Sequence, residues 1–256
     1  MAVRLNNLAK LYYAQGQYAK AEPLYLRSLK IFENALGPDH PNVATDLGNL
    51  AEFYYTQGQY AKAEPLYQRS LKIREKALGP DHPDVAASLN NLATLYFTQD
   101  QYAKAEPLYL RSLKILEKVL GPDHPHVAAN LNNLAELYQE QGQYAKAEPL
   151  YQRALKIWEK ALGPDHPHVA VSLNNLAALY YSQDQYAKAE PLYKRALKIW
   201  EKSLGPDHPD VGNTLEGYAD LLNKTGREKE AASLRARGEV IRKKHERNSI
   251  ARSTDE

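Results

Sequence analysis

The stretch QYAKAEPLY, at residues 59–67, decides the fold because the chain contains it five times. Each copy begins 42 residues after the one before it, and its tyrosine stands at Tyr18, Tyr60, Tyr102, Tyr144 and Tyr186. A second motif, GPDHP, recurs in the same phase and begins at Gly37, Gly79, Gly121, Gly163 and Gly205. Self-similarity at a fixed period of this length is the signature of a repeat protein. The chain is therefore predicted to be an array of one structural unit.

Each unit is predicted to hold two helices. In residues 42–58 the apolar positions follow the i, i+3, i+4, i+7 spacing of one helix face. These positions are Val43, Leu47, Leu50, Ala51 and Tyr54. A break at Gly58 separates this helix, called helix A below, from a second periodic stretch over residues 60–78, called helix B.

The GPDHP loop is predicted to end helix B and to start the next helix A. Gly79 and Pro80 stop the helix, because glycine favours the conformation past a helix end and proline cannot continue it. Pro83 then stands in the first turn of the next helix A, where a proline loses no hydrogen bond. Asp81 or His82 is expected to cap that helix.

Every helix B carries an internal proline, at Pro23, Pro65, Pro107, Pro149 and Pro191. A proline inside a helix removes one main-chain hydrogen bond and costs about 3 kcal/mol. Two interpretations are open: a kink that shapes a site, or a tolerated proline that gives every repeat the same curvature. In both, the prolines are expected to lie inside continuous helices.

The alternation of large and small residues resembles the tetratricopeptide signature. One copy of that signature contains Leu92, Ala93, Tyr96, Ala105, Tyr109 and Ser112. The 42-residue unit with its Asn-Asn-Leu-Ala start and GPDHP loop is similar to the repeat of kinesin light chains, including bacterial kinesin light chain-like proteins. The resemblance covers nearly the whole chain. It implies an all-α, right-handed α-solenoid of antiparallel helix pairs with about twelve helices.

The solenoid is predicted to span residues 1–247, with a disordered tail at 248–256. Its units are expected at about 1–40, 41–82, 83–124, 125–166, 167–208 and 209–247. The last unit departs from the repeat, since Arg235 stands where the other helix B copies have tyrosine, and it is expected to be a capping unit with a solvated face. The basic run at 242–247 is interpreted as part of that face and not as a binding patch.

The composition argues against several classes of function. A formal net charge of +2 gives no reason to expect a nucleic acid or membrane partner. The chain has no cysteine, so it has no disulfide, thiolate nucleophile or cysteine-bound zinc. No apolar run reaches the roughly 18 residues of a spanning helix, and the first residues lack a secretory signal pattern. We expect a cytoplasmic protein.

The reactive residues offer no catalytic site, because nearly all of them recur with the period. His124 with His126, and His166 with His168, suggest a metal site, but the proline between each pair and the exposed loop disfavour a closed ligand set. Phosphate-loop, nucleophile-elbow and HExxH motifs are absent from the sequence. The prediction is a protein that is not an enzyme and that needs no cofactor or metal.

The face of helix A opposite its buried stripe is the candidate binding surface, because it is small, polar and rich in asparagine. In tetratricopeptide proteins the helix A faces line a concave groove. The resemblance therefore implies a ladder of Asn7, Asn49, Asn91, Asn133 and Asn175, with Asn90, Asn132 and Asn174 beside it. Each amide can donate and accept, which suits the main chain of an extended peptide. The alternative is that each asparagine bonds a neighbouring helix and fixes repeat geometry, and the two roles are compatible.

An aromatic stripe borders this face at Tyr13, Tyr55, Phe97 and Tyr181, interrupted by Gln139. Packing against an adjacent helix is the favoured interpretation of the stripe, and groove lining is the other. Kinesin light chains take acidic cargo peptides through basic residues, some of them near the end of helix A, where this chain has the stripe. The groove lysines of carboxylate-clamp relatives are also replaced, by Val3, Thr45, Ala87, Ala129, Val171 and Asn213. Recognition of acidic peptides or chaperone tails is therefore not expected.

The leading hypothesis is an adaptor whose groove binds an extended segment of another protein. The alternative is a structural or self-assembling array without a heterologous peptide ligand. The first helix A has no preceding repeat in this sequence to cover it, so self-association through an uncapped N-terminal edge that includes Val3 and Leu11 is also expected.

Overall fold

The computed structural model describes the backbone of residues 1–254 and the side chains of residues 1–246. Within that part of the chain the regular structure is entirely helical, which confirms the all-α prediction with its count of about twelve. The helices A are α1 (Ala2–Ala14), α3 (Pro41–Thr56), α5 (Pro83–Thr98), α7 (Pro125–Glu140), α9 (Pro167–Ser182) and α11 (Pro209–Lys224). The helices B are α2 (Tyr18–Leu36), α4 (Tyr60–Leu78), α6 (Tyr102–Leu120), α8 (Tyr144–Leu162), α10 (Tyr186–Leu204) and α12 (Glu228–Thr254).

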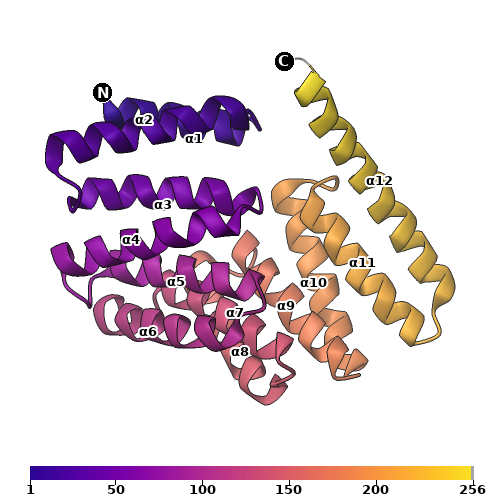
Figure 1. Ribbon diagram of the computed structural model, residues 1–256. Coiled ribbons are helices and arrows are strands. Elements are labelled where there is room, and N and C mark those ends of the chain that lie inside the picture. Colours follow the sequence, from indigo (N-terminus) through magenta and orange to yellow (C-terminus); the bar gives the residue numbers. More distant parts are fainter. Residues whose placement is uncertain (255–256) are drawn as a thin grey trace. The chain divides into compact units, whose positions relative to one another are not determined.

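The helices form two compact units, Met1–Pro122 with α1 to α6 and Asp123–Glu256 with α7 to α12. Within each unit, a helix A packs against the helix B that follows it, and that helix B packs against the next helix A (Figure 1). This pairing is that of helical repeats, in which each repeat contacts chiefly its neighbours. The sequence does not mark the division, because the GPDHP copy at residues 121–125 is the same as the others.

The core forms where the two periodic stripes meet. The five positions predicted for the apolar stripe of α3 are all buried, as are Ala44 and Phe53 of the same helix. The helix B stripe is narrower, and in α4 it buries Ala63, Tyr67 and Ile73. Burial of such side chains stabilises the fold by about 1.5–3 kcal/mol each. Helix A therefore supplies most of the core, and its opposite face is left for other contacts.

Each residue of the GPDHP loop has a structural task. Gly79 has a φ of +88°, which glycine adopts without strain, and Pro83 is the first residue of α5. His82 is the cap, because its Nδ1 accepts a hydrogen bond from the main-chain N–H of Asp84 at 3.1 Å. Asp81 instead forms an ion pair with Lys118 of α6 at 2.5 Å, and this partner lowers the pKa of its carboxyl group.

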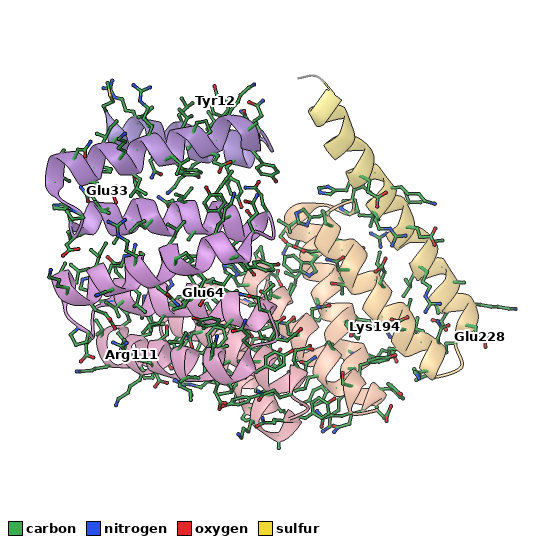
Figure 2. All side chains as sticks on the ribbon, viewed as in Figure 1. Tyr12, Glu33, Glu64, Arg111, Lys194 and Glu228 are labelled. Carbon is green, nitrogen blue, oxygen red and sulfur yellow. The ribbon has the colours of Figure 1, made fainter. Side chains whose placement is uncertain are left out.

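In the QYAKAEPLY motif the glutamate ties helix B to the next helix A, and the lysine ties helix B to the helix A of its own repeat. Glu64 of α4, labelled in Figure 2, accepts a hydrogen bond from the hydroxyl of Tyr96 of α5 at 2.8 Å. The ammonium of Lys104 lies over the Tyr96 ring, 5.0 Å from its centroid. The same contacts recur in the second unit among Glu148, Tyr180 and Lys188. The repetition of these charged residues thus reflects packing within and between repeats.

The helix B prolines lie inside continuous helices, as predicted, in α2, α4, α6, α8 and α10. In α4 the proline follows five helical residues, Tyr60 to Glu64. It therefore costs one hydrogen bond close to the helix start. Because every copy has the same position, the proline belongs to the common repeat geometry.

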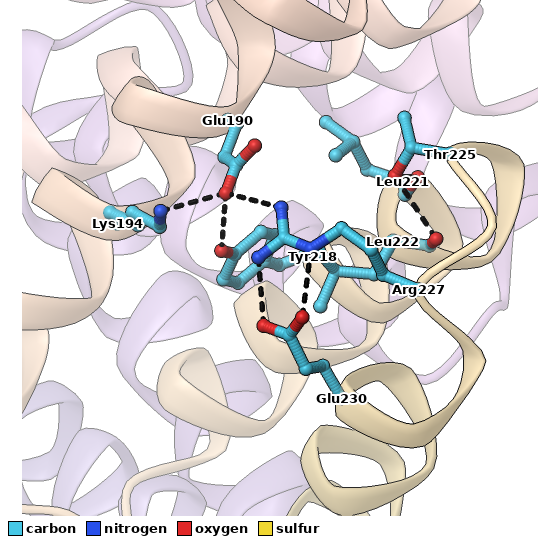
Figure 3. A network of polar contacts seen from close by, with 8 residues as sticks. All are labelled: Glu190, Lys194, Tyr218, Leu221, Leu222, Thr225, Arg227 and Glu230. Carbon is cyan, nitrogen blue, oxygen red and sulfur yellow. Dashed lines mark hydrogen bonds and ion pairs between the residues drawn. The ribbon is translucent and has the colours of Figure 1, made fainter.

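The last repeat is joined to the fifth by a network on Glu190 of α10 (Figure 3). Its carboxylate accepts from Lys194, from the hydroxyl of Tyr218 at 2.9 Å and from Arg227 at 2.8 Å, and Arg227 also binds Glu230. The bonds from Lys194 and Arg227, aided by that from Tyr218, lower the pKa of Glu190 to about 2. In the earlier repeats the equivalent Glu64 and Glu148 accept from a tyrosine and from a neutral glutamine, where Glu190 binds two cations.

The helix α12 carries the charged surface expected of a terminal repeat. Arg235 pairs with Asp220 of α11 at 2.5 Å, and Lys244 pairs with Asp207 at 2.5 Å. These pairs fit the interpretation of the basic run as a solvated face. The helix extends to Thr254 and so enters the predicted tail at 248–256, while side chains after Glu246 and residues 255–256 lie outside the described residues. The tail therefore stays a prediction.

Candidate functional site

The structure divides the predicted asparagine ladder by what each amide contacts. Asn7 and Asn91 are exposed, and Asn175 is half-buried. Among the described residues none of these three has a hydrogen-bond partner. Asn49 is half-buried and donates to Oδ1 of Asn6 at 3.1 Å. Asn133 is half-buried and also bonded, so the ladder contains both free and engaged amides.

The asparagines beside the ladder lie deeper. Asn132 is buried and donates from its Nδ2 to Oγ of Ser172 in α9 at 3.0 Å. Asn90 and Asn174 are half-buried, Asn90 is bonded, and Oδ1 of Asn174 has no partner among the described residues. Their location matches the interpretation in which asparagine fixes repeat geometry. Whether any of them also contacts a partner protein stays a prediction.

Asn6, which lies outside the ladder, makes a buried contact with a carboxylate. Asn6 is buried and donates from Nδ2 to a carboxylate oxygen of Asp46 in α3. The other oxygen of Asp46 accepts from Ser28 of α2 at 2.5 Å. Burial raises the pKa of Asp46, although the bonds from Ser28 and Asn6 and the charge of Lys10 act in the opposite direction.

The aromatic stripe packs against helix B of its own repeat. Tyr13, Tyr55, Phe97 and Tyr181 each meet the tyrosine that opens the following helix, with ring centroids 6.1, 5.7, 5.8 and 5.7 Å apart. The hydroxyl of Tyr55 also lies 2.9 Å from Oγ1 of Thr98 in the next repeat. All four rings are half-buried, so each keeps some exposed surface. Packing, the favoured interpretation, accounts for these contacts.

A cleft lies between α1 and α3 of the first unit, called the first cleft below. It has a volume of about 160 Å³ and includes Asn7, Lys10, Phe32, Asn42 and Asn49 in its lining. Val3 also lines it, and its counterparts Thr45 and Ala87 are exposed. The sequence prediction that Val3 belongs to the uncapped edge is therefore wrong, because its position faces the cleft.

A larger cleft of about 610 Å³ lies between α7 and α9 of the second unit, called the second cleft below. Its lining includes Asn133, Glu136, Trp158, His168 and Asn175. These residues occupy the same repeat positions as Asn7, Lys10, Phe32, Asn42 and Asn49 in the first cleft. The two clefts are thus the same surface built with different side chains.

Trp158 forms the inner wall of the second cleft together with His168. The two rings are stacked, with centroids 4.5 Å apart and an interplanar angle of 26°. The indole is only 6% exposed, and its Nε1 has no hydrogen-bond partner among the described residues. Burial lowers the pKa of His168, and the neighbouring His166 lowers it further. This ring is therefore neutral at neutral pH.

Glu136 gives the second cleft its charge. Glu136 is an exposed residue, but the protein atoms around its carboxyl group and the nearby charge of Glu140 raise the pKa of Glu136. Neither glutamate has a hydrogen bond or ion pair among the described residues. In the first unit the related Glu52 accepts a hydrogen bond from the hydroxyl of Tyr67 at 2.6 Å. The carboxylate of the second cleft therefore lacks the partner that its counterpart has.

The described part of the chain contains neither a metal-binding cluster nor a membrane-spanning helix. There, no cluster of three or more histidine, cysteine or acidic side chains could hold a metal ion. The loop histidines instead use Nδ1 to cap helices, as His124 and His166 do for α7 and α9. None of the described helices combines the length and apolar character needed to cross a membrane.

Reasoning from the sequence did not identify Trp158, Glu136 and His168 as a group. A signal existed, because the position of Trp158 holds Phe32, Arg74, Leu116, Trp200 and Arg242 in other repeats, whereas the core positions hardly change. Residues that vary between otherwise near-identical copies mark where repeats differ in function. Apolar periodicity identifies the positions that are alike in every repeat, so it does not identify this group.

Comparisons with known proteins agree with this architecture. A model of the tetratricopeptide repeat matches residues 1–76, 46–118, 90–157, 126–199 and 173–234. Among curated protein sequences, none matches the chain.

Among solved structures, BtubC (BKLC) from P. vanneervenii has a TM-score of 0.71 and 25% identity over 91% of each chain. A kinesin light chain-like protein of Podosopora anserina with nearly identical repeats has a TM-score of 0.66 and 30% identity, over 78% of this chain and 95% of its own. A Rap protein complexed with Competence and Sporulation Factor has a TM-score of 0.64 at 18% identity, over 94% of this chain and 74% of its own, and shares the fold alone.

Proposed function

The chain belongs to the tetratricopeptide repeat family, and from that premise we propose that it is an adaptor which holds an extended segment of a partner protein against its helix A faces. Solenoids of this kind use their repeated surfaces for binding. On this proposal the chain performs no catalysis and acts in the cytoplasm. The Rap relative, crystallised with Competence and Sporulation Factor, is consistent with a binding role for the fold.

The observation that carries the proposal is the state of Asn91 and Asn175. Both occupy the same position of helix A, one in each unit, and both amides lack a hydrogen-bond partner among the described residues. An amide offers a donor and an acceptor, so each can bind a peptide unit of an extended chain. Neither amide is needed to hold the repeats together.

Asn49 supplies the matched control, because its amide is already bonded to Asn6. We expect Asn49→Ala to lower the free energy of unfolding by about 0.5–1.5 kcal/mol, the usual net value of one hydrogen bond. The double variant Asn91→Ala/Asn175→Ala should unfold within about 0.5 kcal/mol of the parent protein, as surface substitutions do.

The test is affinity capture from the native lysate with the parent chain and both variants, with thermal unfolding measured on the same samples. Proteins held by the parent should be lost from the double variant and retained by Asn49→Ala. Capture of the same proteins at the same yield by the double variant, when it is as stable as the parent, would contradict the proposal.

A second candidate function is self-association through α1. Leu8 is 39% exposed and Leu11 is 52% exposed, whereas their counterparts Leu50 and Phe53 are each 1% exposed. In α3 the helix B of the preceding repeat packs against this side. We propose that a second copy of the chain covers the face in α1, with the two α1 helices packed against each other, because an isologous contact buries both apolar faces at once.

Sedimentation across a range of concentrations tests this contact. The parent protein should sediment as a monomer–dimer mixture, and Leu8→Ser/Leu11→Ser should be monomeric throughout. Leu26→Ser is the control, because Leu26 is an exposed leucine of the neighbouring helix α2. A parent protein that stays monomeric at every concentration would exclude self-association.

A further inference from the structure

The second cleft holds two features that the fold does not use. The first is the carboxylate of Glu136, which has neither a hydrogen bond nor an ion pair among the described residues. The second is the indole N–H of Trp158, which is more than nine-tenths buried and lacks an acceptor among the described residues. A buried donor without an acceptor costs about 1–3 kcal/mol, so neither group is explained by the stability of the fold.

The charge of this cleft selects the sign of its ligand. Burial raises the pKa of Glu136, and the charge of Glu140, which stands one turn away in α7, raises it further. A cation placed beside Glu136 would remove this unfavourable interaction. His168, which also lines the cleft, is neutral at neutral pH and does not compete with such a cation.

Part of the remaining lining of the cleft is apolar, and His126 and His166 also line it. Leu162 and Val171 line it alongside Trp158, with Asn133 and Asn175 at its polar side. Lysine and arginine combine an apolar stem with a charged end, and they place the stem on apolar surface while the charge reaches a polar partner. A volume of about 610 Å³ is in the range of pockets that hold small ligands, so it can hold such a side chain with part of its main chain.

We infer that the second cleft binds an arginine or lysine side chain of an extended peptide, with Glu136 as the counter-charge. The stem lies on Leu162, Val171 and the ring of Trp158. This inference rests on the proposed function, because it names the kind of segment that the helix A face of the second unit holds. The first cleft has Lys10 in the place of Glu136 and does not share this preference.

The experiment is selection of a displayed library of random twelve-residue peptides on the full chain, in parallel with selection on Glu136→Gln. Peptides enriched on the parent should contain an arginine or lysine at an aligned position, and Glu136→Gln should no longer enrich for it. Each enriched peptide is then synthesised with that residue and with glutamine in its place.

Affinity is read from tryptophan fluorescence in a Trp200→Phe background, in which Trp158 is the single reporter. The loss of one charge-assisted contact is expected to weaken binding about tenfold, either through Glu136→Gln or through the glutamine peptide. Combining the two changes should cost no more than either alone. Binding of the basic peptide should also weaken as salt is raised.

A control variant and three further outcomes make the result decisive. Glu52→Gln changes the same repeat position in the first unit, and it should leave the affinity of the basic peptide unchanged. Enrichment of acidic or uncharged peptides would overturn the charge preference while leaving the adaptor proposal intact. Basic peptides that bind Glu136→Gln as tightly as the parent would overturn the role of Glu136. Failure of the selection on the parent chain to enrich any peptide would overturn both proposals together.

Discussion

The first and second clefts show how one repeat surface can acquire two chemistries. Both lie between consecutive helices A, and both place an asparagine from each helix in the lining. The earlier of the two helices A contributes Lys10 to the lining of the first cleft and Glu136 to the lining of the second. The inner wall changes as well, from Phe32 to Trp158. The backbone therefore fixes where a cleft forms, and a few variable positions decide what it can bind.

The polar contacts behind the two clefts differ in the same way. Asn6 donates to the buried carboxylate of Asp46, whereas Asn132 donates to the hydroxyl of Ser172. The first contact involves a charge and the second does not. A buried ionised group needs its hydrogen bonds more than a neutral one does. The first unit thus surrounds its buried carboxylate with hydrogen-bond donors, and the second leaves a carboxylate without a partner in the cleft.

The largest expected effect is reversal of the cleft charge. Glu136→Lys gives the second cleft the residue type of the first, so attraction for a basic peptide becomes repulsion. Relative to the parent, the Kd of a selected basic peptide should rise about a hundredfold, roughly two contributions of one decade each. Fluorescence titration in the Trp200→Phe background measures it. A change below about threefold would show that the cleft charge does not select the ligand.

The next effect concerns stability and compares the two buried asparagines. Asn6→Ala leaves the carboxylate of Asp46 short of a donor and should lower the free energy of unfolding by about 1.5–3 kcal/mol. Asn132→Ala removes a neutral bond and should cost about 0.5–1.5 kcal/mol. Chemical denaturation gives both values, and Asn7→Ala, an exposed neighbour without a bond, is the control. Equal losses from both variants would contradict the distinction between the clefts.

A smaller effect separates the two tryptophans. Trp158 and Trp200 are almost equally buried, yet only the indole N–H of Trp158 is among the buried groups without a partner in the described residues. Trp158→Phe removes that unpaired donor together with the ring contacts. It should therefore destabilise the chain by about 1 kcal/mol less than Trp200→Phe does. Denaturant unfolding of the two variants measures the difference, and a greater loss from Trp158→Phe would refute this account.

The smallest effect is a pH dependence. The folded-state pKa of Glu136 is raised above its unfolded value, so the folded chain binds the proton more tightly than the unfolded chain. Ionised Glu136 therefore reduces stability at neutral pH, and this penalty disappears as pH falls through the folded pKa. Glu136→Gln should unfold at a slightly higher temperature than the parent at pH 7, and the gap should close toward pH 4. A gap that widens on acidification would exclude this sign.

Part of the candidate site could be predicted from the sequence, and part could not. The wheel of helix A correctly identified Asn91 as exposed, because that inference needs only the helical period. It also placed Asn49 outward, and the structure shows that amide bonded to Asn6 of the preceding repeat. Sequence periodicity gives the direction of a side chain and not its partner. Val3 was misplaced for a related reason, because the period shows that a position faces outward and not whether it faces the edge or the cleft.

The sequence by itself determined the helical repeat. The 42-residue period, the two apolar stripes and the GPDHP loop specify helices A and B, since helix starts and stops depend on local residues such as His82 and Pro83. Only the tertiary structure decided which polar groups form hydrogen bonds or ion pairs. Partners such as Asn6 and Asp46 are 40 residues apart and belong to different repeats. Because the repeats differ in sequence, residues at identical repeat positions have different neighbours. The lack of partners for Glu136 and Trp158 therefore follows only from the tertiary structure, in which α7, α8 and α9 pack together.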